Sequence, residues 1–365
     1  KGADKPAHKG YPIGVIISIV GAGIIGLTTA LTLADRGHTV TVHDPDPASG
    51  ATHFAGGMLA PTAEVVYKQD PLFPLMAASA RYYPDLIKLT AKYSDKPTGY
   101  RTDGTLVVAR DTADKTHLAE LREYQEQHGM EVETLTTRQA RKYESALSPA
   151  ISGVVRIAGD HQVQPRLFTQ ALIDACTNAG VTFKRETVDD TEKLEADQVV
   201  VANGLGARDL VPYLDLRPVY GDVLQLRVPD HQYPLLDHVV RGFVEDRPVY
   251  LIPREDRTLT IGATTREDGR AEAQAQGVFQ LLRDAIEIAP AIEECDFLEA
   301  AAGARPGTPD DLPYLGRIDE RTVVSTGYFR HGILLAGLGA RCGAEVVEKQ
   351  APSIDLSACD PRRHE

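Results

Sequence analysis

The pattern of apolar and polar positions is clearest in residues 15–44, where it predicts a strand, a helix and a second strand in close order. Residues 15–20 form an apolar, largely β-branched run of the kind that makes a buried strand. A helix is predicted next, because apolar residues recur at helical spacing: Ile24, Leu27, Leu31 and Ala34. Gly37 lies where a C-terminal cap belongs, and Val40 and Val42 then alternate with polar residues as in a strand.

Farther along, helical and extended patterns follow one another. Amphipathic helices are predicted at 74–93, at 111–129, at 278–288, and from Pro165 to a stop at Gly180. A capping box at 136–139 opens a shorter helix, and the last helix begins near Gly332. Short strands are predicted at 181–184, 199–204 and 322–326. Between 217 and 263 the alternation of apolar and polar residues instead indicates antiparallel strands.

This order of elements predicts an α/β fold with two domains. We expect a discontinuous nucleotide-binding domain of the Rossmann type and an α+β substrate domain built on an antiparallel sheet. The nucleotide-binding domain takes residues 13–89, 151–216 and 301–365, and the substrate domain takes residues 90–150 and 217–300. Residues 1–12 are polar, and we expect them to be a disordered leader.

A glycine fingerprint lies between the first predicted strand and helix. Gly21, Gly23 and Gly26 have the spacing G-x-G-x-x-G. Each glycine has its own role: one allows a tight turn, one lets the backbone approach a pyrophosphate, and one lets the helix pack on the strand. A Cβ would prevent each of these. The helix N-terminus would then face the phosphates with its free N–H groups. The predicted site also takes in the other residues of this turn: Ala22, Ile24 and Ile25.

Asp44 ends the second predicted strand and completes the fingerprint. A carboxylate at this position suits the ribose diol of a dinucleotide and would repel the extra phosphate of an NADP-type cofactor. Residues 12–34 carry no charge, and an uncharged run of this length is also long enough for a membrane span. The fingerprint glycines, several Ser and Thr residues, and the acid after the second strand argue against a span. We therefore predict a dinucleotide site.

Composition excludes several classes of partner. The chain has 365 residues and a net charge of −13. Nucleic acids and anionic membranes bind basic surfaces, so neither is expected as a partner. The cysteines form no C-x-x-C pair, and we predict no metal site and no disulfide framework: Cys176, Cys295, Cys342 and Cys359. This usage fits a reducing, cytoplasmic location.

Small side chains are unusually dense in residues 49–60. A flavin enzyme needs a second loop of this kind, because small residues let a flat ring lie against the backbone. An ordinary flexible loop would have the same composition, so the pattern by itself leaves both interpretations open. The candidate cofactor contacts in this loop are Ala51, Thr52, Ala55, Gly56, Gly57 and Met58. Asn203 and Gly204 join them, because they end a strand that should face the dinucleotide.

Five separated motifs give the chain a family resemblance over about residues 15–347. In order they are VGAGIIGLTTALTLADRGHTVTVHD, ATHFAGGMLAP, VYLIPR followed by LTIGAT, GARPGTPDDLPYLG, and GYFRHGILLA. Together they resemble the ThiO-type glycine oxidases of the D-amino-acid oxidase group. The resemblance implies a noncovalent FAD, oxidation of a small amine-bearing carboxylate by O2, and in many members a role in making the thiamine thiazole. The nucleotide-binding domain would then be an FAD-binding domain.

The resemblance also implies site residues. Arg305, Arg330 and Tyr250 would hold the substrate carboxylate, and this is chemically sensible because guanidinium matches carboxylate bidentately while phenol adds a neutral donor. The helix N-terminus at 332–334 would point at the flavin pyrimidine edge. The cofactor contacts implied in this way are Val188, Gly303, Arg330, His331, Gly332, Ile333 and Leu334.

The chain departs from the family pattern at positions that bear on substrate size. His331 stands where many members have Asn, and Thr265 stands where a familiar glycine oxidase has Met. Pro248 and Val249 replace a polar pair before Tyr250. These changes could serve an N-substituted glycine with a longer tail.

We therefore expect an oxidase that moves a hydride from Cα of glycine, or of a close relative, to flavin N5. Water would hydrolyse the imine to glyoxylate and ammonia, and O2 would become H2O2. The alternative is an oxidase of an N-substituted glycine or another D- or secondary amino acid in a specialised pathway. An NAD-dependent dehydrogenase and a non-catalytic flavin-binding protein are the competing classes. The expected partners are a small amino acid and O2, and we expect a homo-oligomer.

Overall fold

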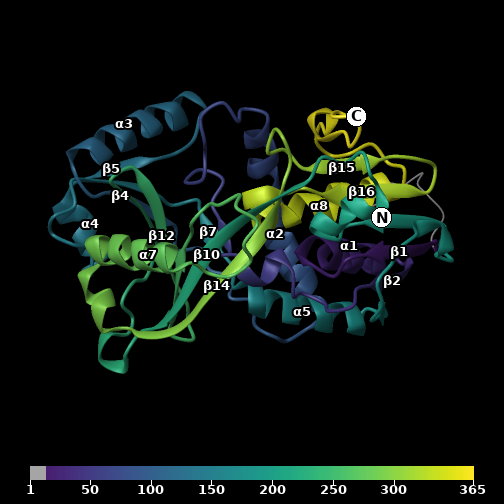
Figure 1. Cartoon of the computed structure of the whole chain (residues 1–365), viewed down its shortest axis with the longest axis horizontal. Helices are drawn as coiled ribbons and strands as arrows, with labels where there is room; N and C mark the ends of the chain where they lie inside the picture. The colour runs from purple at the N-terminus through teal and green to yellow at the C-terminus, as the bar shows by residue number, and fades with distance from the viewer. Residues whose placement is uncertain (1–13) are drawn as a thin grey trace, which may run out of the picture.

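The computed structural model describes residues 14–365, which form two lobes, each built on its own sheet (Figure 1). The predicted disordered leader, residues 1–12, lies outside the described residues. One lobe carries four helices on a six-stranded sheet, and the other carries three helices on an eight-stranded sheet. Two long strands, β10 (Arg217–Arg227) and β14 (Asp296–Gly307), run from the second lobe toward the first.

The six-stranded sheet draws its strands from three distant parts of the chain. Its order is β15-β16-β9-β1-β2-β8, and the strands are parallel except for β15, which is antiparallel at the edge. The strands are β1 (Ile16–Val20), β2 (Thr39–His43), β8 (Thr182–Lys184), β9 (Gln198–Val201), β15 (Tyr314–Arg317) and β16 (Thr322–Thr326). This parallel arrangement with helices between the strands confirms the predicted α/β class.

Four helices pack together on one face of this sheet and enclose its main core. They are α1 (Ile24–Asp35), α2 (Leu72–Tyr93), α5 (Pro165–Asn178) and α8 (Gly332–Val347). Ile17 and Ile19 of β1 point into this core and are fully buried. The opposite face is covered by residues 205–216, which include the short helix α6 (Ala207–Leu210). Both faces of the parallel sheet are thus shielded from water, as its apolar strands require.

The helix boundaries follow the local signals in the sequence. Pro165 occupies the first turn of α5, and Gly180 takes a positive φ of 88° after its end. Capping boxes begin α3 (Thr112–Gln127) at Asp111 and α4 (Thr137–Tyr143) at Thr136. These signals act within one turn of the chain, which is why the helices were predictable from the sequence.

The eight-stranded sheet has the order β14-β10-β13-β12-β11-β4-β6-β5. Its strands are β4 (Thr105–Ala109), β5 (Glu133–Leu135), β6 (Gly153–Ile157), β10 (Arg217–Arg227), β11 (Val239–Val244), β12 (Arg247–Pro253), β13 (Thr258–Gly262) and β14 (Asp296–Gly307). Helix α7 (Ala275–Ile288) packs on one face, and α3 packs on β4 and β6. Strands from segments 90–150 and 217–300 share this sheet.

The sheet differs from the prediction in one pairing and at its limits. β4 pairs parallel to β11, because the two strands come from distant segments that no hairpin forces into antiparallel order. β6 pairs with β4 and β5, beyond the predicted boundary at residue 150. β14 likewise continues past residue 300 while paired with β10. We therefore propose that the domain boundaries lie near residues 158 and 308.

The loop after β2 joins the two lobes. It forms a 3₁₀ turn, η1 (Ala51–Phe54), and then β3 (Met58–Leu59), which pairs with β7 (His161–Gln162). η1 also lies against β14. Within residues 14–365, no helix is long and apolar enough to cross a membrane.

Gly26 allows α1 to approach β1, and this contact gives a test of the fold. A Cβ at Gly26 would overlap the carbonyl oxygen of Gly21, which is fixed backbone. A Cβ at Gly343, inside α8, would lie 3.7 Å from Thr29 Oγ1, an ordinary contact. We expect Gly26→Ala to lower the free energy of unfolding by about 1–3 kcal/mol or more. Gly343→Ala should raise it by roughly 0.5–1 kcal/mol, because Ala favours helix. Urea unfolding followed by circular dichroism measures both, and equal midpoints would contradict the assignment.

Candidate active site

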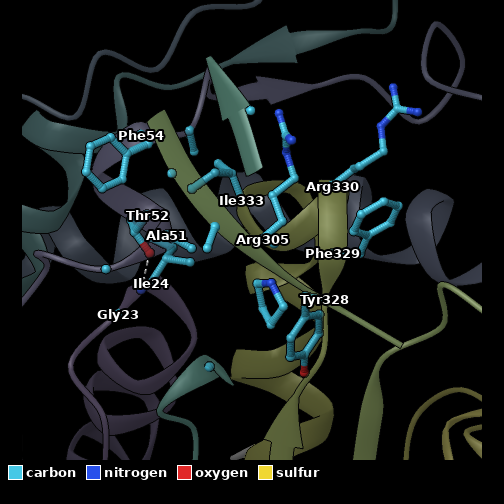
Figure 2. A pocket seen from close by; sticks show the side chains of 18 of the residues that line it. Gly23, Ile24, Ala51, Thr52, Phe54, Arg305, Tyr328, Phe329, Arg330 and Ile333 are labelled. Carbon is cyan, nitrogen blue, oxygen red and sulfur yellow. Dashed lines mark hydrogen bonds between the residues drawn. The ribbon is translucent and has the colours of Figure 1, made fainter. Parts of the chain in front are cut away.

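A cavity of about 710 Å³ lies where the two lobes meet. Its walls come from the β1–α1 turn, the loop at 48–58, the end of β9, strands β10, β12 and β14, and the N-terminus of α8. Figure 2 shows Gly23, Ile24 and Thr52 on one side of this cavity and Arg305 and Arg330 on the other. The cavity thus joins the predicted nucleotide site to the predicted substrate site.

The glycine turn forms the nucleotide end of the cavity. Gly21 has φ +106°, and a Cβ there would lie 2.6 Å from the Ala202 carbonyl oxygen, so only glycine fits. Gly23 is the N-cap of α1 and caps it with no side chain, and the first turn of α1 carries no acidic residue. Gly21, Gly23, Ile24 and Ile25 line the cavity, so the N-terminus of α1 faces it, as it does in a pyrophosphate site. These features fit a bound dinucleotide.

Asp44 lines the same end of the cavity and is held by backbone donors. One carboxylate oxygen accepts from the Ala22 N–H at 2.7 Å, and the other accepts from the Asp46 N–H at 2.8 Å. The carboxylate therefore fixes the glycine turn as well as facing the cavity.

The predicted cofactor contacts of the second loop all line the cavity: Ala51, Thr52, Ala55, Gly56, Gly57 and Met58. Thr52 Oγ1 accepts from the Ile24 N–H at 3.1 Å, which ties this loop to the start of α1 (Figure 2). Gly57 has φ +87°, and a Cβ there would overlap the Val163 carbonyl oxygen. A Cβ at Gly56 would lie 3.0 Å from the Tyr250 hydroxyl. At Gly56 and Gly57 the loop is thus a packed wall with no room for larger side chains, in contrast to a flexible surface loop.

Arg305, Tyr250 and Arg330 are brought together at the other end of the cavity. They come from β14, from β12 and from the turn that precedes α8. Burial lowers the pKa of the Arg305 guanidinium and raises the pKa of the Tyr250 phenol. Arg305 stays charged, and Tyr250 stays a neutral donor. Figure 2 shows the Arg305 and Arg330 side chains extending side by side.

Some of the predicted cofactor residues do not line the cavity. They are Ala22, Gly26, Val188, His331 and Leu334. Gly26 serves packing, and Ala22 donates its N–H to Asp44. Leu334 points into the core between the helices, whereas Val188 packs against the apolar cluster on the opposite face of the sheet. A sequence motif identifies a stretch of backbone. It does not tell which side chains of that stretch line the cavity, and those of Val188, His331 and Leu334 do not.

His331 is buried behind the cavity wall beside a pair that the sequence analysis missed. Arg241 Nη1 lies 3.3 Å from Glu64 Oε1 and donates to the Ala63 carbonyl at 2.9 Å. Glu64 and Arg241 both line the cavity. Burial lowers the pKa of His331 to about 4, so the ring is neutral, and its Nδ1 lies 3.8 Å from Glu64 Oε2. Arg241 is a charged residue inside an apolar strand, and this signal in the sequence could have identified the pair.

Other unpredicted residues complete the walls. Phe54 faces Gly303, where a Cβ would lie 2.5 Å from the Phe54 Cβ. Thr265, Pro248 and Val249, the positions that depart from the family pattern, line one cavity together with Ala271. Across the described part of the chain, no group of three or more His, Cys, Asp or Glu residues could hold a metal ion.

Comparisons with known proteins agree with this geometry. A family model described as FAD dependent oxidoreductase matches residues 17–346. The glycine oxidase of Geobacillus kaustophilus (strain HTA426) is 32% identical over 95% of this chain and 97% of that protein. Its crystal structure matches with a TM-score of 0.88 at 30% identity and covers 97% of this chain and 100% of that one. The bifunctional protein ThiO/ThiG of Synechocystis sp. (strain ATCC 27184 / PCC 6803 / Kazusa) is 31% identical over 95% of this chain, which spans 54% of that relative's length.

Asp160 gives the site a testable pH dependence. Its carboxyl group is fully buried behind Glu64 and accepts from the Thr62 and Ala63 N–H groups at 3.4 and 3.2 Å. Burial raises the pKa of Asp160 from 3.8 to about 7. Between these two values the folded protein binds more protons at Asp160 than the unfolded chain does, so the contribution of Asp160 to stability falls as pH rises.

The side chain introduced by Asp160→Asn cannot ionise. The free energy of unfolding of this variant should therefore increase relative to that of the wild type as the pH rises from 5 to 8. We expect the difference in the free energy of unfolding to change by about 1 kcal/mol or more. Urea unfolding of both proteins at the two pH values measures it. His331 titrates in both proteins, so its contribution cancels, and a difference that does not vary with pH would contradict the burial of an ionising Asp160.

Proposed function

Because this chain belongs to the FAD dependent oxidoreductase family, we propose that it oxidises glycine, or a close relative of glycine, with O2 as the electron acceptor. One observation carries this proposal. A half-buried guanidinium with a neighbouring phenol, Arg305 and Tyr250, lies in the same cavity as a glycine turn built for a dinucleotide. A site that holds a carboxylate at one end and the redox cofactor at the other suits an amino-acid oxidase.

FAD is the cofactor of this family, and the cavity has the features that it needs. Gly21, Gly23 and the N-terminus of α1 would receive its pyrophosphate, and Asp44 would receive its adenosine ribose. The wall of small residues from Ala51 to Met58 leaves room for a flat ring. Bound FAD supplies a two-electron acceptor that takes a hydride from the substrate Cα and delivers the electrons to O2, which gives H2O2.

The main task of the protein is to orient the substrate. Arg305, assisted by Tyr250 and Arg330, would hold the carboxylate and so fix the position of Cα. Gly332 and Ile333 place the N-terminus of α8 at the cavity, and its dipole favours negative charge there. The desolvated site lowers the pKa of the substrate ammonium, so the neutral amine is the reactive form. We therefore assign no general base.

A second candidate is an oxidase of N-substituted glycines. Thr265, Pro248, Val249 and Ala271 give the cavity a wall of small and apolar side chains, which would accept a short N-alkyl group. This wall supports substrates larger than glycine without changing the reaction.

The setting of the reaction is also a proposal. We infer that the imine product supplies thiamine thiazole synthesis, because the chain resembles ThiO along most of its length. The four cysteines are free, which supports a reducing, cytoplasmic location. We further propose that the enzyme is a homo-oligomer.

A substrate panel tests the proposed function. We expect the purified protein to be yellow and to release H2O2 with glycine, sarcosine, other N-alkyl glycines or D-amino acids, measured as oxygen consumption and peroxide. The best substrate should be glycine or an N-alkyl glycine. A colourless protein that reduces NAD⁺ would point to a dehydrogenase, and a yellow protein without peroxide release would point to a flavin-binding protein.

Arg305→Ala tests the carboxylate anchor. Removing a charge-assisted partner from a desolvated site costs about 3–5 kcal/mol, so kcat/KM for the best amino acid should fall by roughly two to four orders of magnitude. Tyr250→Phe deletes a neutral donor to a charge and should cost less, roughly 1.5–3 kcal/mol. An amine that lacks a carboxylate is the control, and its oxidation should change little. Equal, small losses with both substrates at full FAD content would mean that Arg305 is only structural.

A further inference from the structure

The Arg305 guanidinium is held from two sides by neighbouring backbone. It lies over Gly221 of β10, where a Cβ would overlap both of its terminal nitrogens. Its Nη1 also donates to the Thr264 carbonyl at 3.4 Å. Gly221 and Thr264 belong to separate segments, so the direction of the guanidinium depends on how these two segments are fixed relative to each other.

Asp222 fixes Thr264. The Thr264 hydroxyl donates to Asp222 Oδ2 at 2.7 Å, and the Asp222 N–H donates to the same hydroxyl at 2.8 Å. The Thr264 N–H donates to the Asp222 carbonyl at 3.3 Å. Asp222 is fully buried and follows Gly221 directly, so one residue connects both contacts of Arg305.

Arg266 supplies the charge that Asp222 needs in its buried position. Its Nη2 lies 2.9 Å from Asp222 Oδ1, and its Nη1 lies 2.8 Å from Asp268 Oδ1. The same guanidinium donates to the carbonyls of Arg270 and Glu272 at 3.2 and 3.1 Å. A buried carboxylate is stable only when it is paired in this way.

The Arg266 backbone also anchors the segment to β10. It exchanges two hydrogen bonds with Tyr220, at 2.9 and 2.8 Å. Thr265 and Ala271, on either side of this anchor, line the cavity. We call residues 264–272 the roof segment. Arg266 thus holds one wall of the cavity while it pairs with the carboxylate behind Arg305.

We propose that Asp222 and Arg266 are positioning residues, which act through Thr264 to aim Arg305 at the substrate carboxylate. This inference rests on the proposed function, because it takes Arg305 as the carboxylate anchor. The links run in series from Arg266 to Asp222, to Thr264 and to Arg305. A break at any link should leave FAD in place but let the guanidinium turn away, so carboxylate affinity should fall more than catalytic turnover.

The test uses the FAD-bound protein and sodium acetate, a carboxylate without an amine that cannot be oxidised at Cα. Binding is followed by the change in flavin absorbance. Arg266→Gln should raise the Kd of acetate about tenfold, because a displaced Arg305 guanidinium loses most of its aligned interaction with the acetate carboxylate. Arg266→Lys keeps the charge without the planar fork and should show a smaller rise. KM for the best amino acid should rise in parallel, with kcat changed less.

Arg270→Gln is the matched control. Arg270 lies in the same roof segment, pairs with Asp268 at 2.9 Å, and has a side chain that is 66% exposed. This change also removes one positive charge but leaves Asp222 and Thr264 untouched, so acetate binding should stay within about twofold of the wild type. Thr264→Val is the second test variant, because it removes only the hydroxyl that contacts Asp222. If Arg266→Gln does not fold, Thr264→Val decides the question.

The outcomes separate this inference from the proposed function. Acetate binding that is as tight in Arg266→Gln or Thr264→Val as in the wild type overturns the positioning role, even if the wild type oxidises glycine. Weaker acetate binding in these variants, with Arg270→Gln unaffected, supports it even if no amine on the panel is oxidised. If acetate does not perturb the wild-type flavin at all, Arg305 holds no carboxylate and the inference fails.

Discussion

Burial lowers the pKa of the Arg305 guanidinium, so this protein carries a positive charge where little solvent can stabilise it. Within residues 14–365 no carboxylate pairs directly with Arg305, and its charge is compensated from a distance by Asp222, behind Thr264, and by Glu64. The Arg305 guanidinium can therefore attract an anion that enters the cavity. The two sheets, the wall of small residues and the pairing of β10 with β14 all serve to hold this charge at a fixed place relative to the glycine turn.

Much of the fold could be predicted because its signals are local. The capping boxes, the glycines with positive φ and the proline at the start of α5 each act within one turn of chain, and each helix that they indicated is present. The parallel pairing of β4 with β11 and the pairing of β3 with β7 could not be predicted. These pairs join segments far apart in sequence, and no residue in either strand identifies its partner.

The site was predictable where a residue type has one physical use. Gly21 needs its positive φ, and a guanidinium beside Pro and Gly in a family motif indicated Arg305. Sequence patterns do not tell whether a residue contributes its backbone or its side chain, which is why Leu334 was assigned to the cavity although its side chain is buried in the core. Arg241 stood out as a charge inside an apolar strand, but nothing in the sequence pointed to Glu64 as its partner, because the two residues meet only in the folded protein.

The arrangement of the six-stranded sheet has a consequence for synthesis of the chain on the ribosome. β9 is fully buried and lies between β1 and β16, but β16 comes more than a hundred residues after it. Until residues 322–326 emerge, one hydrogen-bonding edge of an apolar strand has no partner. The glycine turn precedes β9 in the chain, but the sheet that supports it closes only when β16 has been made. Between the synthesis of β9 and that of β16, the nascent chain therefore carries an unpaired edge on an apolar strand, and such an edge favours aggregation.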